Sequence, residues 1–273
     1  MNLSLRVQPQ DQLLLVVEIG NTTTSFALFR GEEALEIRKV PSASLSVPGG
    51  AEAYLDEIIT TCPQLRHAAL CSVVPGVDAL ILPALQRRLD GHIVEVSSLL
   101  ELPFSLTYDA PESLGADRIA LCALGRQLHP AEAVILLDIG TAITVDVLGS
   151  RGRYHGGLIM PGLELMARAL HEHTARLPMV TLDLPESLVG QSTDDCIRNG
   201  IIRGCAAGLE GIVEKIRRWL MESYNEADIR LIATGGNAGM ITAMMELVPL
   251  VEEHGVLKGT RYLFALNPPP STC

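Results

Sequence analysis

A short strand that ends in an acid and a tight turn occurs twice in this chain, and this duplication constrains the fold most. The two copies read LVVEIGNTTT and ILLDIGTAIT, 120 positions apart, so that Glu18 corresponds to Asp138 and Thr24 to Thr144. A run of branched apolar residues before the acid predicts a buried strand. A single copy is also typical of an ordinary strand-turn junction, whereas two copies in the same order predict two similar halves.

The residues of each copy suit a phosphate ligand. A carboxylate at the end of a buried strand is held rigidly, where it can bind a hydrated magnesium ion or steer a phosphate. The glycine that follows lets the backbone approach a ligand closely, and the threonines offer hydroxyl and amide donors. We therefore interpret the repeat as a duplicated, acid-bearing phosphate loop.

Bulk composition excludes several classes of protein. The net charge of −11 and the aromatic content of 4% argue against a nucleic-acid partner. The six cysteines lack metal-ligand spacing and predict reduced thiols in a cytoplasmic protein, and we expect no membrane span. An anionic ligand must therefore be held by local donors and cations.

The order of the expected elements repeats as well. An antiparallel meander is predicted at 13–19, 24–29 and 34–40, and again at 133–139, 143–149 and 153–159. Each meander is followed by alternating helices and strands. We expect a loose extension at 1–12, a first half at 13–128 and a second half at 129–273.

This organisation predicts an α/β fold of two ribonuclease-H-like halves, each a mixed sheet flanked by helices, with a nucleotide cleft between them. It resembles the superfamily of sugar kinases, actin and the heat-shock chaperone ATPases, whose two acid-bearing loops grip nucleotide phosphates. This resemblance of fold implies nucleotide chemistry and leaves the acceptor open.

Two further patterns lie in the second half. A capping box at Ser192 predicts a long helix to about Trp219, on which Gly200, Gly204 and Gly208 share one face. That face favours either a subunit interface or close internal packing. The turn at 234–237 (TGGN) is typical of a nucleotide-contacting loop or of a plain turn.

A third motif lies between the repeats, where Gly115 and Ala116 precede Asp117 and Arg118 at the start of a predicted helix. Asp117 can accept a hydroxyl proton, and Arg118 can pair with a substrate carboxylate. The alternative is an aspartate that complements the helix dipole beside an exposed arginine.

At this point the chain resembles the type III pantothenate kinases. The matching motifs, in order along the chain, are IGNT at 19–22, SVVP at 72–75, Tyr108 with Pro111, LGADR at 114–118, DIGTA at 138–142, YHGG at 154–157 with Pro161-Gly162, GQST at 190–193, TGG at 234–236 and Asn267.

The resemblance implies transfer of the ATP γ-phosphoryl group to the primary hydroxyl of pantothenate, the first step of coenzyme A biosynthesis. It also implies ATP with Mg²⁺, a monovalent cation (K⁺ or NH₄⁺) and a cytoplasmic homodimer. Carried over by position, Asp117 is the proton acceptor and Asp138 binds the monovalent cation. The implied ATP and phosphate contacts are Glu18, Ile19, Gly20, Asn21, Thr22, Thr23, Thr24, Ser25 and Thr141. The implied pantothenate contacts are Tyr108, Gly115, Ala116, Asp117, Arg118 and Thr193.

Two positions depart from the family pattern. Glu18 stands where the family has aspartate, and Ile143 stands where many relatives have threonine. Two other functions therefore stay open: a catalytically weakened relative that binds nucleotide or pantothenate as a regulator, and a kinase of another small hydroxy acid.

Overall fold

The computed structural model describes residues 12–269, which form two compact units. The first unit holds the chain up to Pro103, Ala110–Leu124 and the chain from Val256, and the second holds Phe104–Asp109 and Gly125–Gly255. The expected division after residue 128 differs from these bounds, because the chain from Val256 packs with the first unit. The extension expected at 1–12 lies, except for its last residue, outside the described residues.

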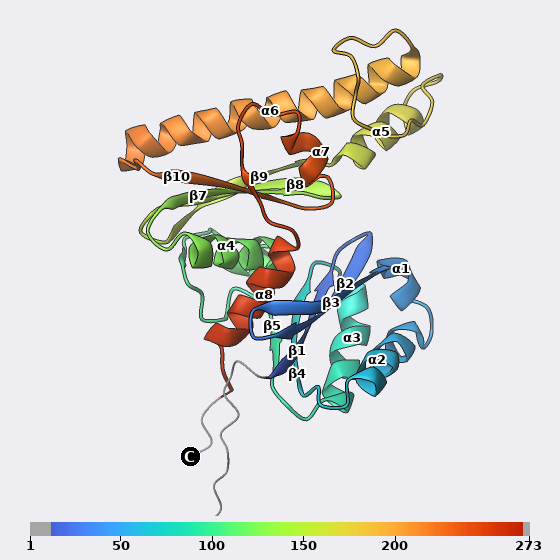
Figure 1. The fold of residues 1–273 in the computed structure, drawn as a ribbon, viewed down its shortest axis with the longest axis vertical. Helices are drawn as coiled ribbons and strands as arrows, with labels where there is room; N and C mark the ends of the chain where they lie inside the picture. Colours follow the sequence, from blue (N-terminus) through green and yellow to red (C-terminus); the bar gives the residue numbers. More distant parts are fainter. Residues whose placement is uncertain (1–11, 270–273) are drawn as a thin grey trace, which may run out of the picture. The chain divides into compact units, whose positions relative to one another are not determined.

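The first unit contains a mixed sheet with the strand order β3-β2-β1-β4-β5 (Figure 1). Strands β1, β2 and β3 form the expected antiparallel meander, and β4 and β5 run parallel to β1. The strands are β1 (Leu13–Ile19), β2 (Thr23–Arg30), β3 (Glu33–Pro41), β4 (His67–Ser72) and β5 (Ile93–Glu95).

Helices cover both faces of this sheet. Odd-numbered residues of β1, such as Leu15 and Val17, face a core formed with α1 (Ser42–Leu45), α2 (Gly50–Thr61) and α3 (Pro75–Arg88). Even-numbered residues, such as Leu14 and Val16, face Leu257 of α8 (Gly255–Leu266). The acid at position 18 therefore lies on the α8 face of the sheet.

The second unit repeats the arrangement with one strand added. Its sheet has the order β11-β10-β7-β8-β9-β6, in which β7, β8 and β9 form the antiparallel meander. The strands are β6 (Ser105–Leu106), β7 (Ala133–Ile139), β8 (Ala142–Leu148), β9 (Arg153–Pro161), β10 (Ile229–Thr234) and β11 (Leu250–Val251). The matching strand orders of the two units confirm the expected ribonuclease-H-like duplication.

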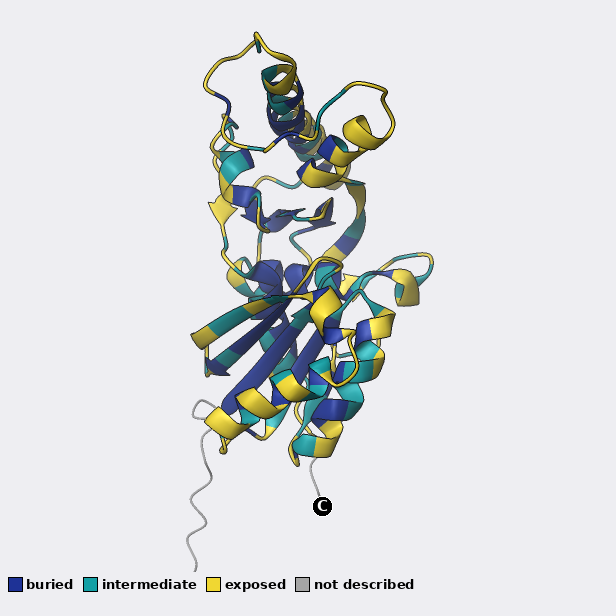
Figure 2. Ribbon diagram, turned by 90° about the vertical axis from the view of Figure 1, so that its right-hand side faces the viewer, coloured by how far each residue is buried: buried dark blue, intermediate teal, exposed yellow. Residues whose placement is uncertain are grey.

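One face of the second sheet is covered by three helices (Figure 1). They are α5 (Leu163–Glu172), α6 (Thr193–Tyr224) and α7 (Ala238–Thr242). Near the end of α4 (Ala116–Leu128), Gly125 of the second unit lies against Leu136 of β7. Figure 2 shows buried strands and exposed outer faces of the helices. A short 3₁₀ helix, η2 (Pro111–Ser113), precedes α4.

The strand register corrects the internal alignment at one point. Ile19 pairs with Thr24 across the first hairpin, whereas Ile139 pairs with Ile143 across the second. The first loop is therefore one residue longer, and the shift of 120 positions holds only up to the turn. The residues opposite the two acids are Ser25 and Thr144.

Across residues 12–269, the structure contains no helix with the length and hydropathy needed to cross a membrane.

Candidate active site

The first acid-bearing loop is clamped by the start of α1. The Gly20 amide donates to the Thr23 carbonyl at 3.0 Å, and the Ser42 amide donates to the Thr22 carbonyl at 3.0 Å. The Ser42 hydroxyl donates to the Gly20 carbonyl at 2.6 Å and lies 2.9 Å from the buried Thr24 hydroxyl. These bonds hold the loop backbone in one shape, which favours rigid positioning of a ligand.

The loop residues differ in what they can offer a ligand. Asn21, Thr22 and Thr23 are exposed at the turn. Thr24 is fully buried and its hydroxyl faces Ser42, so the structure favours a structural role for this side chain over the expected phosphate contact. The Ile19 side chain is also buried in the core, and its carbonyl accepts a hydrogen bond from the Val73 amide at 3.1 Å.

Glu18 is partly buried at the end of β1. Burial raises the pKa of its carboxyl from 4.5 to about 7, with Lys39 lowering this pKa and Asp117 raising it by smaller amounts. The interaction with Asp117 brings the acceptor motif to the first phosphate loop within one unit. A carboxyl that titrates near neutrality in such a place is typical of a functional site.

Asp117 lies in the first turn of α4, and its Oδ1 accepts a hydrogen bond from the Arg118 amide at 2.8 Å. Gly115 lies so close that a Cβ there would stand 2.5 Å from the same oxygen. Arg118 is buried, which contradicts the alternative of an exposed arginine. Ala116 is buried as well, so only its backbone can serve a ligand.

We expect Gly115→Ala to lower kcat by about 100-fold, because the added methyl would displace the Asp117 carboxylate by a distance on the order of 1 Å. The free energy of unfolding should change little, since a carboxylate can move at small cost. Steady-state kinetics and urea unfolding test this. Unchanged kcat in the folded variant would contradict the expected role of Asp117 as the proton acceptor.

The second loop is built around Asp138 at the end of β7. Gly235 has a φ of 97°, and a Cβ there would lie 2.5 Å from Asp138 Oδ1. The Asn237 amide donates to the Ile139 carbonyl at 3.0 Å, and the Gly162 amide donates to the Thr141 carbonyl at 3.0 Å. Three segments that are distant in sequence thus meet at this loop, and the glycine turn lies directly against the Asp138 carboxylate.

The hydroxyl and donor side chains around the second loop differ from those of the first. Thr141 is exposed at the turn, whereas Ile143 is fully buried in β8 and packs in the core. Thr144, opposite Asp138, is buried. The isoleucine therefore occupies a core position, and the exposed part of the loop does not include it.

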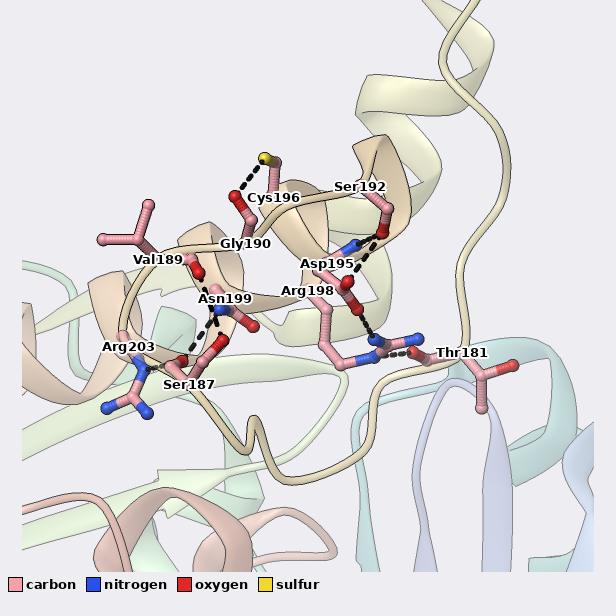
Figure 3. Close-up of polar contacts among 10 residues, drawn as sticks. All are labelled: Thr181, Ser187, Val189, Gly190, Ser192, Asp195, Cys196, Arg198, Asn199 and Arg203. Atoms are coloured by element: carbon pink, nitrogen blue, oxygen red, sulfur yellow. Dashed lines mark hydrogen bonds and ion pairs between the residues drawn. The ribbon is translucent and has the colours of Figure 1, made fainter.

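Thr193 begins α6 in the second unit. Ser192 caps this helix, because its hydroxyl accepts from the Asp195 amide at 3.1 Å and donates to the Asp195 carboxylate at 2.7 Å (Figure 3). The expected start of the helix at Ser192 is confirmed. Thr193 is exposed and lines a cavity of about 1040 Å³ between α5 and α6, with apolar walls that include Leu170 and Ile197.

The segment before α6 is fastened to the helix by side chains of its first turns. Arg198 donates to the Thr181 carbonyl at 3.0 Å and pairs with Asp195 at 2.7 Å (Figure 3). Asn199 and Arg203 both donate to the Ser187 carbonyl, at 2.9 and 3.1 Å. The wall of the cavity beside Thr193 is therefore held in place.

Tyr108 also belongs to the second unit, where its ring packs edge-on against the ring of Tyr154, with the ring centroids 6.0 Å apart. Tyr154 is fully buried and donates to Asp146 at 2.7 Å. The residues expected to bind the acceptor are therefore divided: Gly115 to Arg118 lie in the first unit, and Tyr108 and Thr193 lie in the second.

Two residues near the first loop were missed in the sequence. Ser42, which clamps the loop, lies outside the motifs identified in the sequence. Lys39 lies on β3, in register with Glu18 two strands away. The alternation of residues along 33–41 would place Lys39 on the face of Glu18 only if the pairing of the strands were known.

This duplicated arrangement, with an acid-bearing glycine loop in each unit, is the fold of the actin-like ATPases and sugar kinases. Solved structures support the fold. The chain is similar to a Baf family protein from Campylobacter jejuni (19% identity, TM-score 0.55, covering 92% of this chain and 97% of that one). It is also similar to a glucokinase from an Antarctic psychrotroph (12% identity, TM-score 0.51, covering 94% and 99%).

Sequence relatives give the family. The family model of type III pantothenate kinases matches residues 14–215. A type III pantothenate kinase of Chlorobium luteolum is 48% identical, covering 95% of this chain and 96% of the relative. One of Chlorobium chlorochromatii is 45% identical, covering 94% and 97%. The chain belongs to the type III pantothenate kinase family.

Proposed function

We propose that this chain is an ATP-dependent kinase that transfers the γ-phosphoryl group to pantothenate, giving 4′-phosphopantothenate for coenzyme A biosynthesis. The family match over residues 14–215 carries this function. The site supports it, because Asp117 and Glu18 interact within one unit beside a rigid glycine loop.

In the proposed reaction, the primary hydroxyl of pantothenate attacks the γ-phosphorus. A new P–O bond forms, the bond to the β-phosphate oxygen breaks, and ADP leaves. The hydroxyl proton passes to the Asp117 carboxylate, which Gly115 and the Arg118 amide hold in position. Since phosphoryl transfer needs positioning and charge neutralisation above all, a rigid loop suits this role.

A divalent metal that accompanies ATP would neutralise phosphate charge. Such an ion is commonly held by one or two carboxylates together with the phosphates. The structure offers Glu18 at the first loop and Asp138 at the second, both at strand ends. We assign Asp138 to the monovalent cation, K⁺ or NH₄⁺, and Thr141 to ATP. The carbonyl oxygens of the turn that contacts Asp138 are suitable further donors.

For the acceptor, we propose that Arg118 attracts the pantothenate carboxylate, and we propose Tyr108 and Thr193 as further pantothenate contacts. The support for Arg118 is its place directly after Asp117 and its burial, which strengthens an ion pair by reducing solvent screening. Thr193 is supported by its exposed position in the wall of the cavity.

A coupled assay of ADP release with Mg-ATP and K⁺ tests this function. Turnover that depends on pantothenate supports it. Binding of pantothenate without turnover would favour the regulator, and turnover only with another small hydroxy acid would favour a kinase of that acid. Either of those results would overturn the proposal.

We also propose that the protein is a homodimer, with the glycine face of α6 at its interface. Among the described residues, and leaving aside the neighbouring residues of α6 itself, no atom lies within 4 Å of a Cβ placed at Gly200, Gly204 or Gly208. This open space favours an interface over close internal packing as the reason for the glycines. Exposed glycines at this spacing would let a second helix approach closely.

We expect Gly204→Arg to shift the protein from dimer to monomer, because a long side chain would separate the two helices. Sedimentation velocity measures this. Gly76→Arg is the matched control, since Gly76 is a helical glycine of the first unit with equally open surroundings. A Gly204→Arg protein that stays dimeric would exclude this face from the interface.

We further propose a cytoplasmic location. The cysteines in the described part of the chain support it, because they form no disulfide.

A further inference from the structure

Three side chains stand in a row across the first sheet at the level of the acid. The strand register places Glu18 of β1 opposite Ser25 of β2, and Ser25 opposite Lys39 of β3. Directly paired residues point to the same face of a sheet. Ile37, two residues before Lys39, packs in the core beneath α8, which confirms the face.

The spacing lets the lysine reach the acid. Neighbouring strands lie about 4.8 Å apart, so the Cα atoms of Lys39 and Glu18 are roughly 10 Å apart. Ser25 between them is small and buried, so a long side chain can extend over it. Lys39 is exposed and interacts electrostatically with Glu18. Its ammonium group is thus available at the loop.

The negative charges at the loop would be offset by a nearby cation. Glu18 and Asp117 are both carboxyl groups, the expected ligand carries phosphates, and the chain has a net charge of −11. The second unit differs at this place, because Ile159 pairs with Thr144 where Lys39 pairs with Ser25. The lysine is therefore a feature of the first loop.

We propose that Lys39 is a phosphate-binding residue of the first loop. Its ammonium group contacts the terminal phosphoryl group of the nucleoside triphosphate beside Glu18. This role rests on the proposed function in that the ligand is ATP. The ammonium group offsets charge that develops on the phosphoryl oxygens during transfer.

The test compares Lys39→Met with Arg38→Met. Arg38 is the next residue of the same strand, points to the opposite face, and pairs with Glu36 and Glu57 at 2.6 and 2.8 Å. Both variants lose one positive charge. We expect Lys39→Met to lower kcat/KM for ATP by about 100-fold, and Arg38→Met to keep it. Lys39→Arg, which retains the charge, should recover most of the loss.

A second measurement is independent of turnover. In isothermal titration, inorganic tripolyphosphate should bind wild type, Arg38→Met and Lys39→Arg, and bind Lys39→Met at least about 10-fold more weakly. Circular dichroism confirms folding of each variant. Equal binding to Lys39→Met and wild type, or no binding to wild type, would overturn the proposal. If tripolyphosphate binds through Lys39 but wild type does not phosphorylate pantothenate, the proposed function fails and the phosphate contact stands.

Discussion

Asp117→Asn is expected to lower kcat by about a thousand-fold while leaving the protein folded. The amide cannot take the hydroxyl proton, and general-base catalysis of this kind typically contributes 10²–10⁴-fold, roughly, to the rate. The asparagine Oδ1 can still accept the hydrogen bond from the Arg118 amide, so the local geometry should persist. Steady-state kinetics with Mg-ATP and pantothenate measure the loss.

The matched control for this variant is Glu52→Gln. Glu52 lies in the first turn of α2, in the same unit. Its substitution by Gln therefore removes a negative charge from a helix start, as Asp117→Asn does. Either change should reduce stability by at most about 1 kcal/mol through the helix dipole. Only Asp117→Asn should affect kcat. Near-normal kcat for Asp117→Asn would exclude the proton-acceptor role and leave helix capping as the function of this aspartate.

The second large effect is expected at Glu18. The carboxyl has a pKa of about 7 in the folded state, mainly through burial, against 4.5 for a solvent-exposed glutamate. The folded protein therefore holds this proton more tightly than the unfolded chain, and ionisation weakens the fold as the pH rises from 4.5 to 7. The cost at pH 8 is roughly 3 kcal/mol, because the pKa differs by about 2.5 between the two states.

Glu18→Gln removes this cost. We expect its free energy of unfolding to exceed that of wild type by roughly 3 kcal/mol at pH 8, and by little at pH 4.5. Urea unfolding at both pH values measures the difference. Its kcat should fall by about 100-fold, because the amide cannot replace an ionised carboxylate in holding the metal ion that accompanies the phosphates. A variant that is equally active, or not stabilised at pH 8, would contradict the assigned state of Glu18.

Glu18→Asp separates charge from geometry. The aspartate keeps the charge and matches the family pattern, so we expect it to retain or improve activity. A large loss would show that this site is built around the longer side chain of glutamate.

The sequence predicted the architecture because the signal was duplicated. Two apolar runs that end in an acid and a glycine specify two buried central strands, and each is followed by a strand pattern of period 2. The matching orders β3-β2-β1-β4-β5 and β9-β8-β7-β10-β11 follow from this repeat. The place of α8 was not predictable, because helical periodicity does not indicate which sheet a helix covers.

The details of the first loop were less accessible. Thr24 and Thr144 align in sequence, but the loop is one residue longer in the first hairpin, and only the pairing reveals it. For the same reason, the buried Thr24 could not be distinguished from the exposed Thr23. Lys39 gave no motif, because its relation to Glu18 arises from strands brought together by folding.

The central claim is that phosphoryl transfer to the primary hydroxyl of pantothenate depends on Asp117. Mass spectrometry of the product, formed from ATP labelled with ¹⁸O in the γ-phosphoryl group, tests it most directly. The wild type should give labelled 4′-phosphopantothenate, and Asp117→Asn should give almost none in the same time. Unlabelled or absent product with the wild type, or equal product with Asp117→Asn, would contradict the account.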